Sequence, residues 1–148
     1  MKALFFIVVG LVLVMSGCQA TAEATTVRPK EVVLVATDIA FDQTQLQVKS
    51  GQLVRLTLRN DGVLEHDFSV LEIALDGEAM VREEQAADDG AEHDMSQMGA
   101  EPDVHVAASQ GERNTVEFTP SEPGEYAYFC TVAGHREAGM AGTLVVVP

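Results

Sequence analysis

Basic residues and cysteines are scarce in this chain of 148 residues. Nine lysines and arginines stand against 23 aspartates and glutamates, which gives a formal net charge of −14. This charge argues against nucleic acid and against an anionic membrane surface as electrostatic partners, because both would repel it. It favours a basic partner, or it serves only solubility. The sequence also lacks an internal repeat and any Ser-His-Asp or Cys-His pattern of a nucleophilic enzyme.

The N-terminal apolar run is too short to cross a membrane as a helix. It extends from Ala3 to Val14, whereas a spanning helix needs ~20 residues. A lysine precedes the run, and small residues follow it in the sequence MSGC. This pattern predicts a signal peptide over residues 1–17 and therefore an exported protein that faces the periplasm or the cell exterior.

The MSGC sequence resembles a bacterial lipobox, in which Cys18 becomes the lipidated first residue of the mature protein. Met15 stands where that pattern usually has leucine, so plain signal cleavage without a lipid is the alternative. Residues 18–30 have little to bury and predict a flexible tether between the lipid and the domain.

The shortage of cysteine leaves Cys130 without an obvious disulfide partner, because Cys18 is the only other cysteine. Exported proteins normally pair their cysteines. A lone thiol outside the cytoplasm is exposed to oxidation. The expected partner of Cys130 is therefore a bound metal.

Apolar and polar residues alternate along most of the chain after the tether. In one example, Val54, Leu56 and Leu58 alternate with polar residues, so they are expected to face inward. Turn sequences such as Ser-Gly and Asn-Asp-Gly separate these runs. Seven or eight short strands without helical periodicity predict an all-β fold, a Greek-key antiparallel β-sandwich.

Residues 76–103 interrupt this alternation. They contain ten acidic residues and a single basic one, Arg82. A short helix over residues 78–87 is compatible with the pattern. The remainder is too polar to bury much surface, so the segment is interpreted as an acidic surface insertion.

Near the C-terminus three soft metal ligands share one loop. Four residues separate Cys130 from His135, and four more separate His135 from Met140. Imidazole suits Cu(II), whereas thiolate and thioether suit Cu(I), and two His, one Cys and a distant Met form a blue copper site. The second His must come from elsewhere, and His66 is best placed because it begins an apolar strand. His105 is expected to be a strand residue at the surface or at an interface.

Two segments, NDGVLEHDFSV and FTPSEPGEYAYFCTVAGHREAGMAGTLVV, resemble the cupredoxins, the family of plastocyanin and azurin. The loop spacing is most similar to that of the auracyanins. Apart from the insertion, the resemblance covers residues 31–148. It implies one type 1 copper per chain with the ligands His66, Cys130, His135 and Met140. Asp67 stands where the family commonly has an asparagine that braces the backbone beside the cysteine. Its carboxylate is expected to accept a hydrogen bond near Thr131 and to add negative charge near the copper.

The predicted function is transfer of single electrons between membrane or soluble redox partners. Such a partner is a cytochrome or a respiratory or photosynthetic membrane complex with a basic docking face. The alternative is a copper storage or delivery protein that uses His93, Met95 and Met98 in the insertion. A copper enzyme is disfavoured, because the chain has four histidines and no His-x-His pair.

Overall fold

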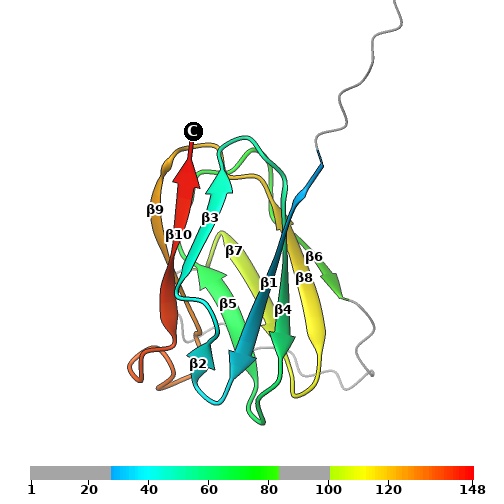
Figure 1. Cartoon of the computed structure of the whole chain (residues 1–148), viewed down its shortest axis with the longest axis vertical. Coiled ribbons are helices and arrows are strands. Elements are labelled where there is room, and N and C mark those ends of the chain that lie inside the picture. Colours follow the sequence, from blue (N-terminus) through cyan, green and yellow to red (C-terminus); the bar gives the residue numbers. More distant parts are fainter. Residues whose placement is uncertain (1–27, 84–100) are drawn as a thin grey trace, which may run out of the picture.

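The computed structural model describes residues 28–83 and 101–148. In this part of the chain two five-stranded sheets pack face to face around an apolar core (Figure 1). The prediction of an all-β sandwich is confirmed. The predictions for Cys18 and for His93, Met95 and Met98 concern residues outside the described ranges. Within those ranges, no helix has the length and apolar character needed to cross a membrane.

The described residues form ten strands rather than seven or eight. They are β1 (Lys30–Thr37), β2 (Ala40–Phe41), β3 (Gln45–Lys49), β4 (Val54–Asn60), β5 (His66–Val70), β6 (Met80–Glu83), β7 (Val104–Ala108), β8 (Arg113–Phe118), β9 (Gly124–Phe129) and β10 (Ala141–Val147). One sheet has the order β2-β1-β4-β8-β6, and the other has the order β3-β10-β9-β5-β7.

Two of the strand pairings are parallel, β1 with β4 and β3 with β10. The antiparallel expectation therefore holds for the other pairings and not for these two. Parallel neighbours need a crossover connection. After β2 the chain crosses to the second sheet to form β3 and then returns to the first sheet as β4. Alternation along a strand shows which residues face inward, but it carries no information on the direction of the neighbouring strand.

The core is built as the alternation predicts. Val54, Leu56 and Leu58 on β4 are fully buried between the sheets. Tyr128 on β9 is the largest fully buried side chain, and its ring centroid lies 5.5 Å from that of Phe41 and 5.1 Å from that of Phe68. Tilted aromatic contacts at these distances add to the free energy gained by burying apolar area.

Part of the acidic segment belongs to the sandwich. Met80–Glu83 form β6, which pairs antiparallel with β8, so the helix expectation is wrong for these residues. The edge of β8 offers unpaired backbone groups that an extended segment can satisfy. At the other end of the segment, a carboxylate oxygen of Asp103 accepts a hydrogen bond from the backbone N–H of Ile73 at 2.8 Å.

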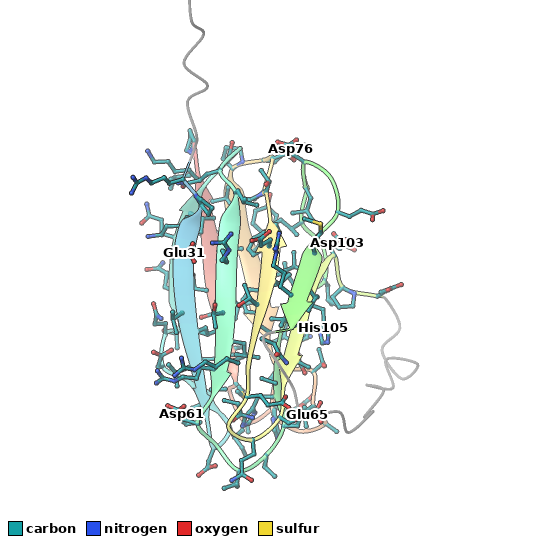
Figure 2. The ribbon with its side chains drawn as sticks, turned by 90° about the vertical axis from the view of Figure 1, so that its right-hand side faces the viewer. Glu31, Asp61, Glu65, Asp76, Asp103 and His105 are labelled. Carbon is teal, nitrogen blue, oxygen red and sulfur yellow. The ribbon has the colours of Figure 1, made fainter. Side chains whose placement is uncertain are left out.

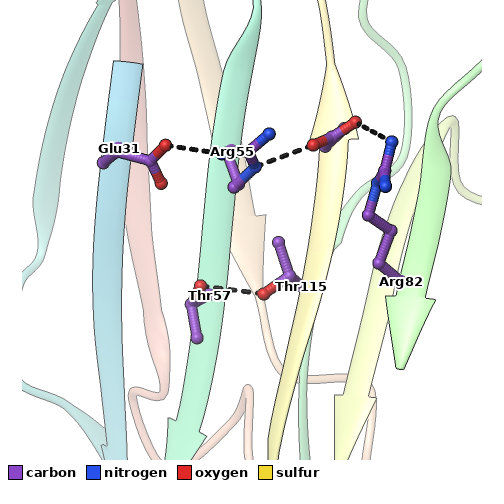
Figure 3. Close-up of polar contacts among 6 residues, drawn as sticks. Glu31, Arg55, Thr57, Arg82 and Thr115 are labelled. Carbon is purple, nitrogen blue, oxygen red and sulfur yellow. Dashed lines mark hydrogen bonds and ion pairs between the residues drawn. The ribbon is translucent and has the colours of Figure 1, made fainter. Parts of the chain in front are cut away.

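A row of charges on the outer face of the first sheet ties β6 to its neighbours (Figure 3). The buried carboxylate of Glu117 accepts a hydrogen bond from Arg55 at 2.7 Å and pairs with Arg82 at 3.1 Å. Arg55 also pairs with Glu31 at 2.8 Å. The hydrogen bond from Arg55 is the main cause that holds the pKa of Glu117 below its ordinary value. A depressed pKa in the folded state means that this network stabilises the fold at neutral pH and loses that contribution as Glu117 is protonated in acid.

Candidate metal centre

The loop between β9 and β10 and the turn between β4 and β5 lie at the same end of the sandwich (Figure 1). We call this the ligand end, because the turn leads into His66 and the loop contains Cys130, His135 and Met140. The start of β1 and the C-terminus lie at the opposite end.

The turn before His66 is held by Asn60, which is fully buried. Its side-chain N–H groups donate to the carbonyl oxygens of Leu64 at 2.7 Å and Ala108 at 2.9 Å, and its side-chain oxygen accepts from Gly62 N at 2.9 Å. Gly62 packs against the imidazole, since a Cβ at this position would lie 3.1 Å from His66 Nε2. The sequence showed a turn here, but it did not show that the turn braces the His66 ring.

The ligand loop is compact because its backbone closes on itself. Cys130 N donates to the carbonyl oxygen of Met140 at 3.1 Å, and Met140 N donates to that of His135 at 3.0 Å. Gly134 and Gly139 have φ values of 85° and 101°, a conformation that residues with a Cβ rarely adopt. The four-residue spacings therefore fold into a loop that places its first and last ligand residues side by side.

Three of the predicted ligands converge in the interior. One potential ligand atom from each of His66, Cys130 and His135 lies within 4.8 Å of the others. The ring centroids of the two histidines are 5.0 Å apart, and Cys130 Sγ lies 3.4 Å from His135 Nδ1. His135 is 6% exposed, while the other three predicted ligands, Met140 included, are fully buried.

The donor set fits a copper ion. Among the described residues, both ring nitrogens of His66 are buried without a hydrogen-bond partner. An unsatisfied buried nitrogen is costly, and native proteins rarely leave one without a purpose. A metal bound to one of them would remove part of that cost. Two imidazoles and one thiol, with the buried Met140 joined to Cys130 by a backbone hydrogen bond, match the ligands of an ion that alternates between Cu(II) and Cu(I).

A family model described as copper binding proteins of the plastocyanin/azurin family matches residues 12–147. The chain belongs to this family. Auracyanin-A from Chloroflexus aurantiacus is 32% identical over 114 residues, which cover 74% of this chain and 68% of that protein. Copper-resistant cuproprotein CopI from Rubrivivax gelatinosus is 33% identical over 114 residues, but the match spans 64% of that protein and 77% of this chain.

Solved structures agree with the family assignment. Auracyanin B superposes with a TM-score of 0.58 at 27% sequence identity, over 80% of this chain and 89% of that one. A multicopper oxidase superposes with a TM-score of 0.54 at 16% identity, and the match covers 79% of this chain and 44% of the oxidase. This similarity shows a shared fold alone. The cupredoxin assignment and copper as the cofactor therefore rest on the family match together with the converging side chains.

In this cupredoxin, burial favours the neutral forms of the Cys130 thiol and the His66 imidazole when no metal is bound. Burial, with the negative charge of Asp67 as a smaller cause, raises the pKa of the Cys130 thiol to about 12. Burial also lowers the pKa of His66, and the neighbouring His135 lowers it further. Only the thiolate binds copper strongly, so loading at neutral pH releases the thiol proton and becomes less favourable as the pH falls.

Asp67 braces the backbone beside Cys130. Its carboxylate accepts hydrogen bonds from Thr131 N at 3.0 Å, Thr131 Oγ1 at 2.7 Å and Ser69 Oγ at 2.9 Å. Cys130 Sγ lies 3.7 Å from the nearer carboxylate oxygen. The expected hydrogen bond near Thr131 is confirmed. The contribution of Ser69 was missed, although its position two residues after Asp67 places both on one face of β5.

Proposed function

We propose that the chain is an exported electron carrier, not an enzyme, in which His66, Cys130, His135 and Met140 hold one copper ion. The observation that carries the proposal is the convergence of two buried imidazoles and a buried thiol, with His66 left without a hydrogen-bond partner among the described residues. When bound, the copper supplies a one-electron couple. The described residues contain one group of this kind, which suits a carrier better than an oxidase with several coppers.

The protein contributes a fixed ligand geometry to this function. Asn60 fixes the turn before His66, the loop hydrogen bonds fix Met140, and Asp67 fixes the backbone after Cys130. His66 and the backbone after Cys130 are thus held by residues other than the predicted ligands, whereas Met140 is held by backbone hydrogen bonds with Cys130 and His135. A site held in this way changes little when the oxidation state changes, so electron transfer requires little rearrangement.

The surface around His135 suits brief contact with a redox partner. Val63 is 65% exposed and Leu64 is 45% exposed in the turn before His66. Ala133 and Ala138 are exposed in the ligand loop. An apolar rim beside a barely exposed ligand gives a partner a place to exclude water near the site, and a small contact separates quickly.

A charge placed in this rim tests its role. Val63→Asp is expected to lower the electron self-exchange rate by about tenfold, because contact at this surface then brings two carboxylates together. Val33→Asp is the matched control, since Val33 is 51% exposed on β1 at a distance from the ligand end and the change in net charge is the same. Stopped-flow or NMR line broadening measures both rates. Equal rates in the two variants would show that the rim is not part of the docking surface.

The position at which β1 begins supports a membrane-anchored carrier. β1 begins at the end opposite the ligand loop (Figure 1), so an anchor joined through residues 18–30 leaves the ligand end free for partners. We expect the mature protein to begin at a lipid-modified Cys18 and to fractionate with membranes. The intact mass of the mature chain measures this, and an unmodified N-terminus at another residue would contradict it.

The proposed partner is a redox protein with a basic docking face, either a cytochrome or a respiratory or photosynthetic membrane complex. Figure 2 shows that Asp61 and Glu65 lie at the ligand end of the sandwich, and the net charge has the same sign. Opposite charges raise encounter rates and do so less as salt is added. Second-order rates with the native partner at several salt concentrations measure this steering.

Copper handling is the second candidate. It is favoured by the similarity to a protein named copper-resistant cuproprotein and by the sequence around His93, Met95 and Met98. A handling protein must release its ion. It would therefore lose copper to a competing Cu(I) chelator far faster than an electron carrier does.

A further inference from the structure

A row of polar side chains crosses the outer face of the second sheet beside the ligand end. Ser69 on β5 lies opposite His105 on β7 in the strand register, so both point to the same face. Asp67 lies on this face two residues earlier. Ser69 and Asp67 are fully buried, and His105 is partly exposed. Figure 2 places His105 on the side of the sandwich, between the two ends.

Hydrogen bonds link these three residues, and the donors and acceptors along them follow one order. Ser69 Oγ lies 2.9 Å from a carboxylate oxygen of Asp67 and 2.8 Å from His105 Nδ1. A carboxylate only accepts, so the single hydroxyl proton of Ser69 is donated to Asp67. With Asp67 as the acceptor of that proton, the hydroxyl accepts from His105, and this arrangement needs the tautomer of His105 that carries its proton on Nδ1. The chain of donors runs from His105 through Ser69 to Asp67.

The far end of this chain reaches the proposed copper site. The other carboxylate oxygen of Asp67 lies 3.7 Å from Cys130 Sγ and accepts from Thr131 Oγ1 at 2.7 Å. We propose that Ser69 and His105 are positioning residues that set the reduction potential of the copper through the Asp67 carboxylate. This inference rests on the proposed ligand set.

The direction of the effect follows from electrostatics. Each donor places the positive end of its dipole on the carboxylate and offsets part of the negative charge beside Cys130. Without the donor from His105, the hydroxyl of Ser69 is less polarised and offsets less of that charge. A more negative field favours the more highly charged oxidised ion. Loss of the chain therefore makes reduction less favourable.

Two substitutions at one position separate the hydrogen bond from the charge of the ring. His105→Leu removes the donor, whereas His105→Asn places an amide N–H where Nδ1 was. Neither variant carries the charge that an imidazole can gain. We expect His105→Leu to reduce the equilibrium constant for one-electron reduction by about three- to tenfold, a tenfold change being about 59 mV for one electron. We expect His105→Asn to retain the wild-type value within about twofold.

A double-mutant cycle tests whether the two residues act in series. Ser69→Ala should lower the potential in the same direction as His105→Leu. The double variant should then show little shift beyond that of Ser69→Ala, because the proposed effect of His105 on the carboxylate passes through the hydroxyl. Additive shifts, or equal shifts in His105→Leu and His105→Asn, would overturn the proposal. So would unchanged potentials accompanied only by lower melting temperatures.

The copper-free protein gives an independent readout. Long-range ¹H–¹⁵N NMR at pH 8 should show the proton of His105 on Nδ1 in the wild type, and a proton on Nε2 alone would contradict the chain. Failure of the copper site is distinguishable, because it appears as a missing visible absorption band in the loaded wild-type protein. Failure of this inference leaves that band intact.

Discussion

The Cys130→Ser variant is expected to lose the intense visible absorption of the copper-loaded protein almost completely. That absorption is a charge transfer from thiolate sulfur to Cu(II), and a hydroxyl oxygen at the same place does not provide it. Cys130 is fully buried with its sulfur 3.4 Å from His135 Nδ1, so water cannot replace the sulfur without rearrangement of the loop. Oxygen is also a poor ligand for Cu(I), and affinity for the reduced ion should fall by at least about tenfold. Visible spectra of the oxidised protein and competition with a Cu(I) chelator measure the two effects.

The chain supplies its own control, because Cys18 is its only other cysteine. Cys18→Ser removes the same atom from the predicted tether and should leave the visible spectrum unchanged in a domain expressed without its signal. A band that persisted in Cys130→Ser, or that vanished in Cys18→Ser, would show that the colour has another origin.

The second large effect is on stability. Gly142→Ala is expected to lower the free energy of unfolding by about 3 kcal/mol, because the added methyl group has no room. A Cβ at Gly142 would lie 2.3 Å from the ring of Tyr128 and 2.7 Å from the carbonyl oxygen of Thr44. The ring cannot easily move away, since it is packed in the core and its hydroxyl donates to the carbonyl oxygen of Gln43. Burial raises the pKa of Tyr128 to about 12, so the hydroxyl keeps this proton at neutral pH.

Gly124→Ala is the matched control, because Gly124 also lies in a strand of the second sheet. Its closest neighbours would be atoms of the Tyr126 ring at 3.3 Å, and Tyr126 is only partly buried. We expect a cost below about 1 kcal/mol there. Urea unfolding of the copper-free variants measures both, which keeps metal binding out of the comparison. An equal loss in the free energy of unfolding at the two positions would contradict the close contact between Gly142 and the Tyr128 ring.

The sequence predicted those features that depend on local pattern. Alternation identified Val54, Leu56 and Leu58 as core residues, and all three are fully buried. Loop spacing identified Cys130 and His135, and the structure brings both together with His66. Soft ligands at close spacing between two apolar strands have few other physical explanations. The metal site could therefore be predicted from this loop without knowledge of the fold.

Features that depend on strand neighbours were not predictable in this way. The parallel pairings and the pairing of Met80–Glu83 with β8 are set by which chain segments meet in space. For the same reason the hydrogen bond between Ser69 and His105 was not predicted. These residues are 36 positions apart in the sequence and meet because β5 pairs with β7. Met80–Glu83 lay within the possible helix over residues 78–87, because the sequence does not show that the edge of β8 has backbone groups to pair with them.

A redox titration of the copper-loaded protein tests the central claim most directly. Visible absorption and bound copper are followed together through several cycles of reduction and reoxidation, in the presence of a Cu(I) chelator. An electron carrier with the proposed ligands should show an intense visible band that bleaches with one electron per chain, returns fully on oxidation and retains one copper throughout. A colourless Cu(II) form, or copper that passes to the chelator on each reduction, would contradict the account.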